Sequence, residues 1–133
     1  MINILLVDDD MLLRLVVMTS IGLTFKDCKV LSADSGKEAV NILNSEQVHF
    51  VLTDLFMHEM DGFQLIEYIT TNHPEIPVAA MSGDGGATTR ERLRDLGVSK
   101  FLEKPFNLKD LQHMVSELPG IGKNGTAISY IAA

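Results

Sequence analysis

The chain has 133 residues, 46% of them hydrophobic and 22% charged, a composition typical of one globular domain. Its net charge of -7 and its lack of Lys/Arg runs argue against direct binding to nucleic acid, which requires a basic surface. A single cysteine excludes an intrachain disulfide, no stretch approaches the ~20 apolar residues of a membrane span, and the N-terminus lacks a basic leader. We therefore expect a cytoplasmic domain that does not contact a membrane.

The chain begins with a strand and a helix. Residues 2–7 form an apolar run of strand length, which ends at three consecutive aspartates. Residues 11–23 then have the apolar content of a helix, and Asp9 or Asp10 is placed to cap its free N–H groups. A carboxylate cluster therefore follows the first strand directly.

A second and a third strand follow, with a helix between them. Residues 29–32 predict a weaker strand, and Ser35 opens a helix with Glu38 at the spacing of a capping box. Residues 50–53 predict a strand that is buried on both faces and ends at Asp54. Taken alone, Asp54 would simply be the first residue of a turn. A functional role for it requires that the ends of the other strands converge on it.

The second half of the chain continues the alternation. Helices are predicted at residues 63–71, 87–96 and 108–118, and strands at residues 78–81 and 100–103. Gly97 suits the left-handed residue that closes a helix. The two strands end on Ser82 and Lys104, so polar side chains follow four of the five predicted strands.

Five consecutive strand–helix units require parallel pairing and right-handed crossovers, with helices on both faces of the sheet. We therefore predict an α/β fold of the flavodoxin-like (βα)5, doubly wound type. Its five-stranded parallel sheet would have the order 2-1-3-4-5 and form the middle of a three-layer α/β/α arrangement. That order places Asp8, Asp9 and Asp10 beside Asp54, at the switch point where such folds bind ligands.

Converging carboxylates predict a cation site. Two carboxylates within ~4 Å repel by about 4 kcal/mol at an effective dielectric constant near 20, and a cation or a proton relieves this repulsion. Oxygen ligands suit Mg²⁺, which often shares a substrate phosphate. The Ser82 hydroxyl and the Lys104 ammonium would complete a phosphate-sized pocket, in which an aspartate is a competent nucleophile toward phosphorus. Taken singly, these residues are equally consistent with a helix cap, a turn or a solvated charge.

Several motifs, in this order and spacing, resemble the receiver domain of two-component response regulators. The motifs are Ile4-Leu5-Leu6-Val7-Asp8-Asp9-Asp10, Leu52-Thr53-Asp54-Leu55, Met60-Asp61-Gly62, Pro77-Val78-Ala79-Ala80-Met81-Ser82-Gly83 and Lys104-Pro105-Phe106. The resemblance covers residues 1–118 and implies a phosphoacceptor signalling domain that catalyses only its own phosphorylation and dephosphorylation. Residues 119–133, which contain three glycines, are expected to be a flexible tail or a truncated linker.

The resemblance implies a phosphorelay. Asp54 would accept a phosphoryl group from a phosphohistidine of a sensor histidine kinase or a histidine phosphotransfer protein. Asp8, Asp9, Asp54 and the backbone carbonyl of Phe56 would hold Mg²⁺ (or Mn²⁺). Where the family usually has a proline four residues after the acceptor, this chain has His58, which we interpret as a loop residue and not as a metal ligand.

The resemblance also implies a conformational switch. Ser82 and Lys104 would bind the phosphoryl oxygens, and Phe101 would turn inward when Ser82 moves toward the phosphate. Position 101 is Phe where Tyr is common, so this ring would switch by packing alone. The Lys104–Pro105 bond would be cis, a geometry that is rare outside X-Pro bonds.

Two predicted surfaces bear on partners. The helix at residues 11–23 is apolar almost all round, so it either forms extra core or exposes a docking face, which in receivers binds the kinase or phosphotransfer bundle. The surface of the fourth helix, fifth strand and fifth helix is the usual face for a homodimer. Its mixed charges, which include Arg90, Arg92 and Arg94, are equally consistent with a plain solvated face.

Two alternative functions remain open at this stage. A small haloacid-dehalogenase-like phosphatase would use Asp8 and Asp10, although the chain has no later acidic pair and no cap domain. A receiver-like scaffold would act without phosphorylation. In the receiver hypothesis, Phe56 and Asp84 flank the approach of the hydrolytic water, and the bulk of Phe56 predicts slow dephosphorylation.

Overall fold

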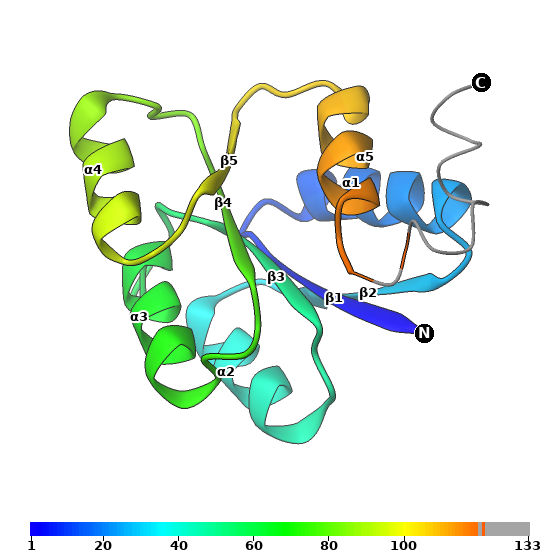
Figure 1. Ribbon diagram of the computed structural model, residues 1–133, viewed down its shortest axis with the longest axis horizontal. Coiled ribbons are helices and arrows are strands. Elements are labelled where there is room, and N and C mark those ends of the chain that lie inside the picture. The colour runs from blue at the N-terminus through cyan, green and yellow to red at the C-terminus, as the bar shows by residue number, and fades with distance from the viewer. Residues whose placement is uncertain (120, 122–133) are drawn as a thin grey trace.

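The computed structural model describes residues 1–119 and 121 (Figure 1). Five parallel strands form one sheet in the order β2-β1-β3-β4-β5. The strands are β1 (Ile2–Val7), β2 (Cys28–Ala33), β3 (Phe50–Asp54), β4 (Val78–Ser82) and β5 (Lys100–Glu103). The helices are α1 (Met11–Thr24), α2 (Gly36–Ser45), α3 (Gly62–Asn72), α4 (Ala87–Asp95) and α5 (Leu108–Ser116). The predicted fold class and strand order are therefore confirmed.

The apolar side chains of β1 alternate between the two faces of the sheet. Ile4 and Leu6 pack in a cluster with residues of α1 and α5, whereas Leu5 and Val7 pack in a second cluster with residues of α2 and α3. In Figure 1, α1 and α5 lie on one side of the sheet, and α2 and α3 lie on the other. All four are fully buried, and each such side chain stabilises the fold by about 1.5–3 kcal/mol. A central strand buried on both faces therefore holds the three layers together.

The register of the sheet aligns the ends of its strands. Val7 pairs with Thr53, and Asp54 pairs with Met81. Asp8, which follows Val7, is thereby placed next to Asp54 at the carboxyl edge. The convergence inferred from strand order therefore follows from the pairing of residues.

Side-chain caps begin four of the five described helices, and α4, whose N-cap is Gly86, has none. Asp10, not Asp9, caps α1, because its Oδ1 accepts hydrogen bonds from the N–H groups of Leu12 and Leu13. The predicted capping box of α2 is only half formed. Ser35 Oγ accepts from the N–H of Glu38, but the Glu38 carboxylate accepts from the N–H of Asp34 instead of that of Ser35.

The start of α3 is fixed beside β3. Asp61 and Gln64 form a complete capping box, and α3 begins at Gly62, one residue before the predicted start. A Cβ on Gly62 would overlap the backbone carbonyl of Asp54. The absence of a side chain at position 62 therefore lets α3 approach β3 closely.

The later elements differ little from the predictions. Gly97 has φ 83°, as expected for the residue that closes α4, and the Lys104–Pro105 bond is cis. Helix α5 ends at Ser116 and not at Leu118. Leu118 and Ile121 are buried against α1 and α5 through a turn. The expected tail, apart from Pro119 and Ile121, lies outside the described residues.

The one cysteine lies in the interior. Cys28, at the start of β2, is only 8% exposed and belongs to the cluster under α1 and α5. Burial, followed by the nearby charge of Asp27, raises the pKa of its thiol to about 11. Within the described residues, no helix has both the length and the apolar character that a membrane span requires.

Candidate functional site

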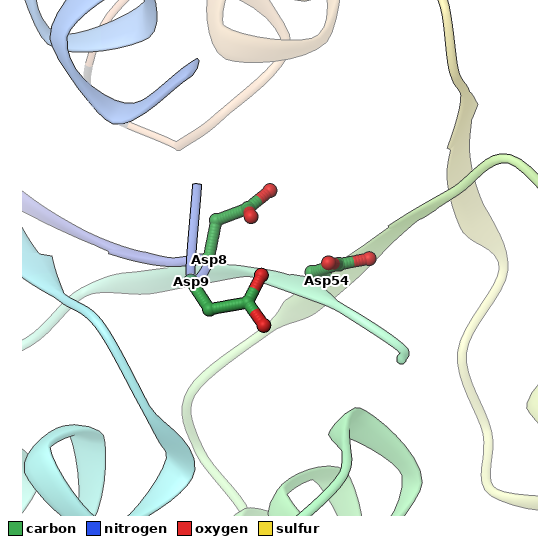
Figure 2. Close-up of side chains that lie close together, drawn as sticks. All are labelled: Asp8, Asp9 and Asp54. Carbon is green, nitrogen blue, oxygen red and sulfur yellow. The ribbon is translucent and has the colours of Figure 1, made fainter. Parts of the chain in front are cut away.

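Three aspartates meet at the carboxyl edge of the sheet. Asp8 and Asp9 follow β1, Asp54 ends β3, and one carboxylate oxygen from each lies within 4.8 Å of the other two (Figure 2). Asp8 is fully buried, Asp54 is 7% exposed, and Asp9 faces solvent. The site therefore combines two interior carboxylates with one at the surface.

Lys104 joins this carboxylate cluster from the end of β5. Its Nζ lies 2.8 Å from Asp8 Oδ2 and 3.4 Å from Asp54 Oδ2. Burial by itself lowers the pKa of Lys104. The hydrogen bond and the charge of Asp8, together with the charge of Asp54, outweigh that effect, so the pKa is raised overall. Lys104 therefore stays an ammonium at neutral pH and offsets part of the negative charge.

The electrostatic environment of Asp54 is unfavourable to its charge. Burial, followed by repulsion from Asp8, raises the pKa of the Asp54 carboxyl above its ordinary value. The Lys104 ammonium and the N–H of Leu55 act in the opposite direction but do not cancel the rise. Any cation brought to this site would therefore relieve a repulsion that the folded chain already carries.

Backbone hydrogen bonds orient the two buried carboxylates. Asp54 Oδ1 accepts from the N–H of Leu55 at 2.9 Å, and Asp8 Oδ1 accepts from the N–H of Asp10 at 2.9 Å. In each case the other oxygen, Oδ2, is the one that faces Lys104. The Arg14 guanidinium donates to the backbone carbonyl of Asp8 at 2.7 Å, a contact that the sequence did not suggest.

Ser82 lies on the opposite side of Asp54 from β1, at the end of β4. It is buried, its Oγ accepts from the N–H of Asp84 at 3.0 Å, and the N–H of Lys104 donates to its backbone carbonyl at 2.8 Å. Within the described residues this hydroxyl donates no hydrogen bond, so its hydrogen can serve another acceptor. Asp84 is itself held in its loop, since its Oδ1 accepts from the N–H of Gly86 at 3.0 Å.

The other predicted site residues lie around this cluster. Phe56 is 53% exposed, and its ring packs edge-on against Phe63. Phe101 is half-buried beneath the guanidinium of Arg90, whose Cζ lies 4.7 Å from the ring centroid. His58 is exposed. The metal role of the Phe56 carbonyl stays a prediction.

The donor set fits a hard divalent cation. Carboxylate oxygens are the ligands that Mg²⁺ prefers, and Asp9, at the solvent side, leaves room for the waters that this ion retains. Asp10 does not belong to the group, because its carboxylate caps α1. The arrangement can bind a cation and, next to it, an anionic group that Lys104 and Ser82 reach from β5 and β4.

Comparisons with known proteins agree with this geometry. A family model described as the response regulator receiver domain matches residues 4–116. The chain is 36% identical over 115 residues to the transcriptional regulatory protein GlrR of Escherichia coli (strain K12), covering 86% of this chain and 26% of that protein. It is 34% identical over 119 residues to the two-component response regulator ORR5 of Oryza sativa subsp. japonica, covering 87% of both.

A solved structure has the same fold. The chemotaxis protein CheY4 of Vibrio cholerae superposes with a TM-score of 0.81 at 21% identity, covering 89% of this chain and 98% of that one. The chain spans about a quarter of the length of the bacterial regulators that it matches, which include GlrR and the response regulator protein FleR of Pseudomonas aeruginosa. It matches most of the length of the plant regulator.

Proposed function

The chain belongs to the response regulator receiver domain family of two-component systems, and from that membership we propose that Asp54 is its phosphoacceptor. The donor would be a phosphohistidine of a sensor histidine kinase or a histidine phosphotransfer protein. One observation carries the proposal. Asp54 ends the central strand β3 inside a carboxylate cluster, with its Oδ2 3.4 Å from the Lys104 ammonium.

The transfer follows from the chemistry of these side chains. A carboxylate oxygen of Asp54 attacks phosphorus, the P–N bond of the donor breaks, and its electron pair stays on the imidazole nitrogen, which takes up a proton. The product is an acyl phosphate on Asp54. Lys104 neutralises the phosphoryl oxygens, and Ser82 donates its free hydroxyl hydrogen to one of them.

The carboxylate cluster would hold the metal of this reaction. Asp8, Asp9 and Asp54 would bind Mg²⁺ (or Mn²⁺), together with the backbone carbonyl of Phe56. When bound, the ion supplies positive charge that offsets the carboxylates and the incoming phosphoryl group. The raised pKa of Asp54 supports this role, because burial of the carboxyl and then repulsion from Asp8 disfavour its charge, and a bound cation would offset both effects.

Signal output would depend on Ser82 and Phe101. Ser82 Oγ accepts its hydrogen bond from Asp84, in the loop that leads to α4, so turning toward a phosphoryl oxygen changes that loop. Phe101 lies half-buried on the neighbouring strand and has no hydroxyl to anchor it outside. Its inward turn would alter the surface of α4, β5 and α5, where we place a homodimer or target contact.

The exposed apolar face of α1 supports docking of the phosphoryl donor. Met11, Leu12 and Leu23 are each more than 60% exposed, and α1 begins directly after the carboxylate cluster. A kinase or phosphotransfer bundle could pack on this face while presenting its phosphohistidine to Asp54. Such a donor would be met in the cytoplasm, and we propose no direct contact with nucleic acid or membrane.

The decisive experiment is covalent mapping. The protein is incubated with acetyl phosphate and Mg²⁺, the acyl phosphate is trapped with borohydride, and the modified residue is located by peptide mass spectrometry. We expect the adduct on Asp54 and none in Asp54→Asn. Asp34→Asn is the matched control, because Asp34 also follows a strand, β2, but lies outside the cluster.

The same experiment separates the alternative functions. An adduct on Asp8 would instead indicate a haloacid-dehalogenase-like phosphatase, and a protein without any adduct would be a scaffold. The phosphatase alternative has little support from the geometry, because Asp10, its second aspartate, is used to cap α1. We therefore propose a signalling domain and not a turnover enzyme.

We further propose that the aspartyl phosphate is long-lived. Hydrolysis requires a water in line with the bond to the leaving carboxylate oxygen. Phe56, two residues after the acceptor, has no polar atom to hold such a water. Asp84 could orient a water, but a water can be oriented only after it has been admitted past the Phe56 ring. Obstruction by Phe56 should therefore dominate.

A further inference from the structure

The side chain of Arg92 on α4 covers an aromatic ring on α3. Its Cζ lies 3.7 Å from the centroid of the Phe63 ring. A guanidinium over a ring face is attracted by the negative charge of the π system and also stacks on it. In the described part of the chain Arg92 forms no ion pair, so this ring is the contact that defines its position.

The covered ring is itself fixed in the core. Phe63 is 3% exposed and lies in the first turn of α3, whose start is held by the Asp61–Gln64 capping box. It packs in a cluster that also contains Leu55, the residue after the acceptor. Phe63 is therefore closely packed and has little room to move independently of its neighbours.

Phe63 also contacts the ring of Phe56. The two centroids are 6.0 Å apart with an interplanar angle of 75°, an edge-on contact. Because Phe56 is 53% exposed, it has few other neighbours to restrain its ring. The row Arg92–Phe63–Phe56 thus runs from α4 to the loop that follows Asp54.

We propose that Arg92 is a positioning residue for the lifetime of the phosphoryl group. Through Phe63 it holds Phe56 across the approach to Asp54, although it does not itself touch the acceptor. A movement of α4, caused by rearrangement of the preceding loop or by a bound partner, would then release the ring and admit water. The inference rests on the proposed function, because it requires an aspartyl phosphate at Asp54.

The test compares single and double variants of the full chain. Wild type, Arg92→Gln, Arg92→Lys, Phe56→Asn and the double variant Arg92→Gln/Phe56→Asn are phosphorylated with acetyl phosphate and Mg²⁺. The reagent is then removed, and decay of the adduct is followed by intact mass. Arg94→Gln is the matched control, because Arg94 is an exposed arginine of the same helix that contacts no ring in the described residues.

We expect Arg92→Gln to shorten the half-life roughly threefold, a change in barrier well within the range of one lost contact. Arg94→Gln should decay like wild type, and Arg92→Lys, which keeps a cation, should lie between wild type and Arg92→Gln. In the Phe56→Asn background, Arg92→Gln should have no further effect, because the ring that it positions is gone. A purely structural role of Arg92 would not produce this dependence on Phe56.

Three outcomes would overturn the inference. They are equal half-lives for wild type and Arg92→Gln, equal effects of the Arg92 and Arg94 changes, and an Arg92 effect that persists in the Phe56→Asn background. Urea unfolding of each variant identifies any that does not fold, and Arg92→Lys then takes the place of Arg92→Gln in the double variant. Absence of an adduct at Asp54 in wild type would instead refute the proposed function and this inference with it.

Discussion

The middle of the sheet and its carboxyl edge belong to the same strands, but buried side chains have apolar neighbours in the middle and charged neighbours at the edge. On β3, Val51 and Leu52 are buried among apolar side chains on the two faces of the sheet. Two residues beyond Leu52, Asp54 is almost as deeply buried, but among charged groups. The first environment stabilises the fold, and the second raises the pKa of the carboxyl that lies in it.

On β3, the residues that stabilise the fold are therefore different from the residue for which we propose phosphorylation. A domain is stable by only about 5–15 kcal/mol, so a buried and repelling cluster is tolerated only when the packing beneath it offsets the repulsion. The apolar residues of β1 and β3 provide that packing on both faces. We therefore expect substitutions in the middle of the sheet to affect unfolding, and substitutions at its edge to affect phosphorylation.

The largest effect on unfolding should come from Leu52→Ala. Its side chain is fully buried in the cluster with α1 and α5, and truncation of such a leucine destabilises a protein by about 2–5 kcal/mol. Asp54→Asn, two residues further, should leave the free energy of unfolding unchanged or raise it, because it removes a charge that is disfavoured by burial and by repulsion from Asp8. Urea unfolding without Mg²⁺ measures both variants.

Leu12→Ala is the matched control for this prediction. Leu12 is 69% exposed on α1, so the same truncation should change the free energy of unfolding by less than about 0.5 kcal/mol. If Asp54→Asn destabilised the protein as much as Leu52→Ala, the cluster would be part of the structural core, and the comparison would fail.

The next effect concerns metal binding at the edge. Mg²⁺ at about a hundred times its dissociation constant should raise the free energy of unfolding by about 2.7 kcal/mol in wild type. Asp9→Ala should lose this gain and the Mg²⁺-dependent labelling of Asp54, while its unfolding without metal stays unchanged or improves. A marked fall in the metal-free midpoint of Asp9→Ala would show that Asp9 has mainly a structural role.

A smaller effect is expected from the ring of Phe56, two residues after Asp54. Phe56→Asn should accelerate hydrolysis of the aspartyl phosphate about tenfold, equal to roughly 1.4 kcal/mol of barrier. Its unfolding should change little, because Phe56 is largely exposed. The decay of labelled protein in Mg²⁺ buffer measures this rate, and a variant that decays as slowly as wild type would show that Phe56 does not gate the water.

The smallest effect should appear in the pH dependence of the metal-free protein. Because the pKa of Asp54 is raised on folding, the folded state binds this proton more tightly than the unfolded state. As the pH rises from the ordinary value near ~3.9 through the raised pKa, wild type should lose stability relative to Asp54→Asn. Lys104 stays charged across this window because its pKa is also raised, so it partly offsets the loss.

Paired urea midpoints from about pH 4 to about pH 8 measure this difference. The advantage of Asp54→Asn should grow with pH and then level off above the pKa of folded Asp54. A difference that stays constant would mean that Asp54 titrates alike in the folded and unfolded chains. Adding Mg²⁺ should remove or reverse the advantage, because an ion bound at the cluster would stabilise the ionised Asp54 carboxylate, which the variant lacks.

The sheet and most of the carboxylate cluster could be predicted because each depends on local patterns. Apolar runs of strand length, each ended by a polar residue, locate four of the five strand ends, and parallel pairing then brings those ends together. The end of α5 could not be predicted in the same way. Leu118 is apolar at helical spacing, but a turn buries it as well as a helix would.

The contacts of the α4 arginines could not be predicted. Their charge indicated a solvated face or a dimer surface, whereas Arg90 lies over Phe101 and Arg92 over Phe63. A long side chain can reach partners on several elements, and the spacing of residues along the chain does not determine which partner it contacts. The capping box of α3 is a different case, because Asp61 and Gln64 stand at the diagnostic spacing and the signal was simply missed.

The buried thiol of Cys28 makes the native chain suitable for selective chemical labelling. With a pKa of about 11, only about one thiol in ten thousand is a thiolate at neutral pH, and 8% exposure limits access to that fraction. Maleimide dyes should therefore not react with the wild-type protein. A new cysteine at Leu12, on the exposed face of α1, could then carry a single fluorophore without removal of Cys28. Because Cys28 would stay unlabelled, the fluorescence would come from position 12 alone and would report binding of a partner to α1.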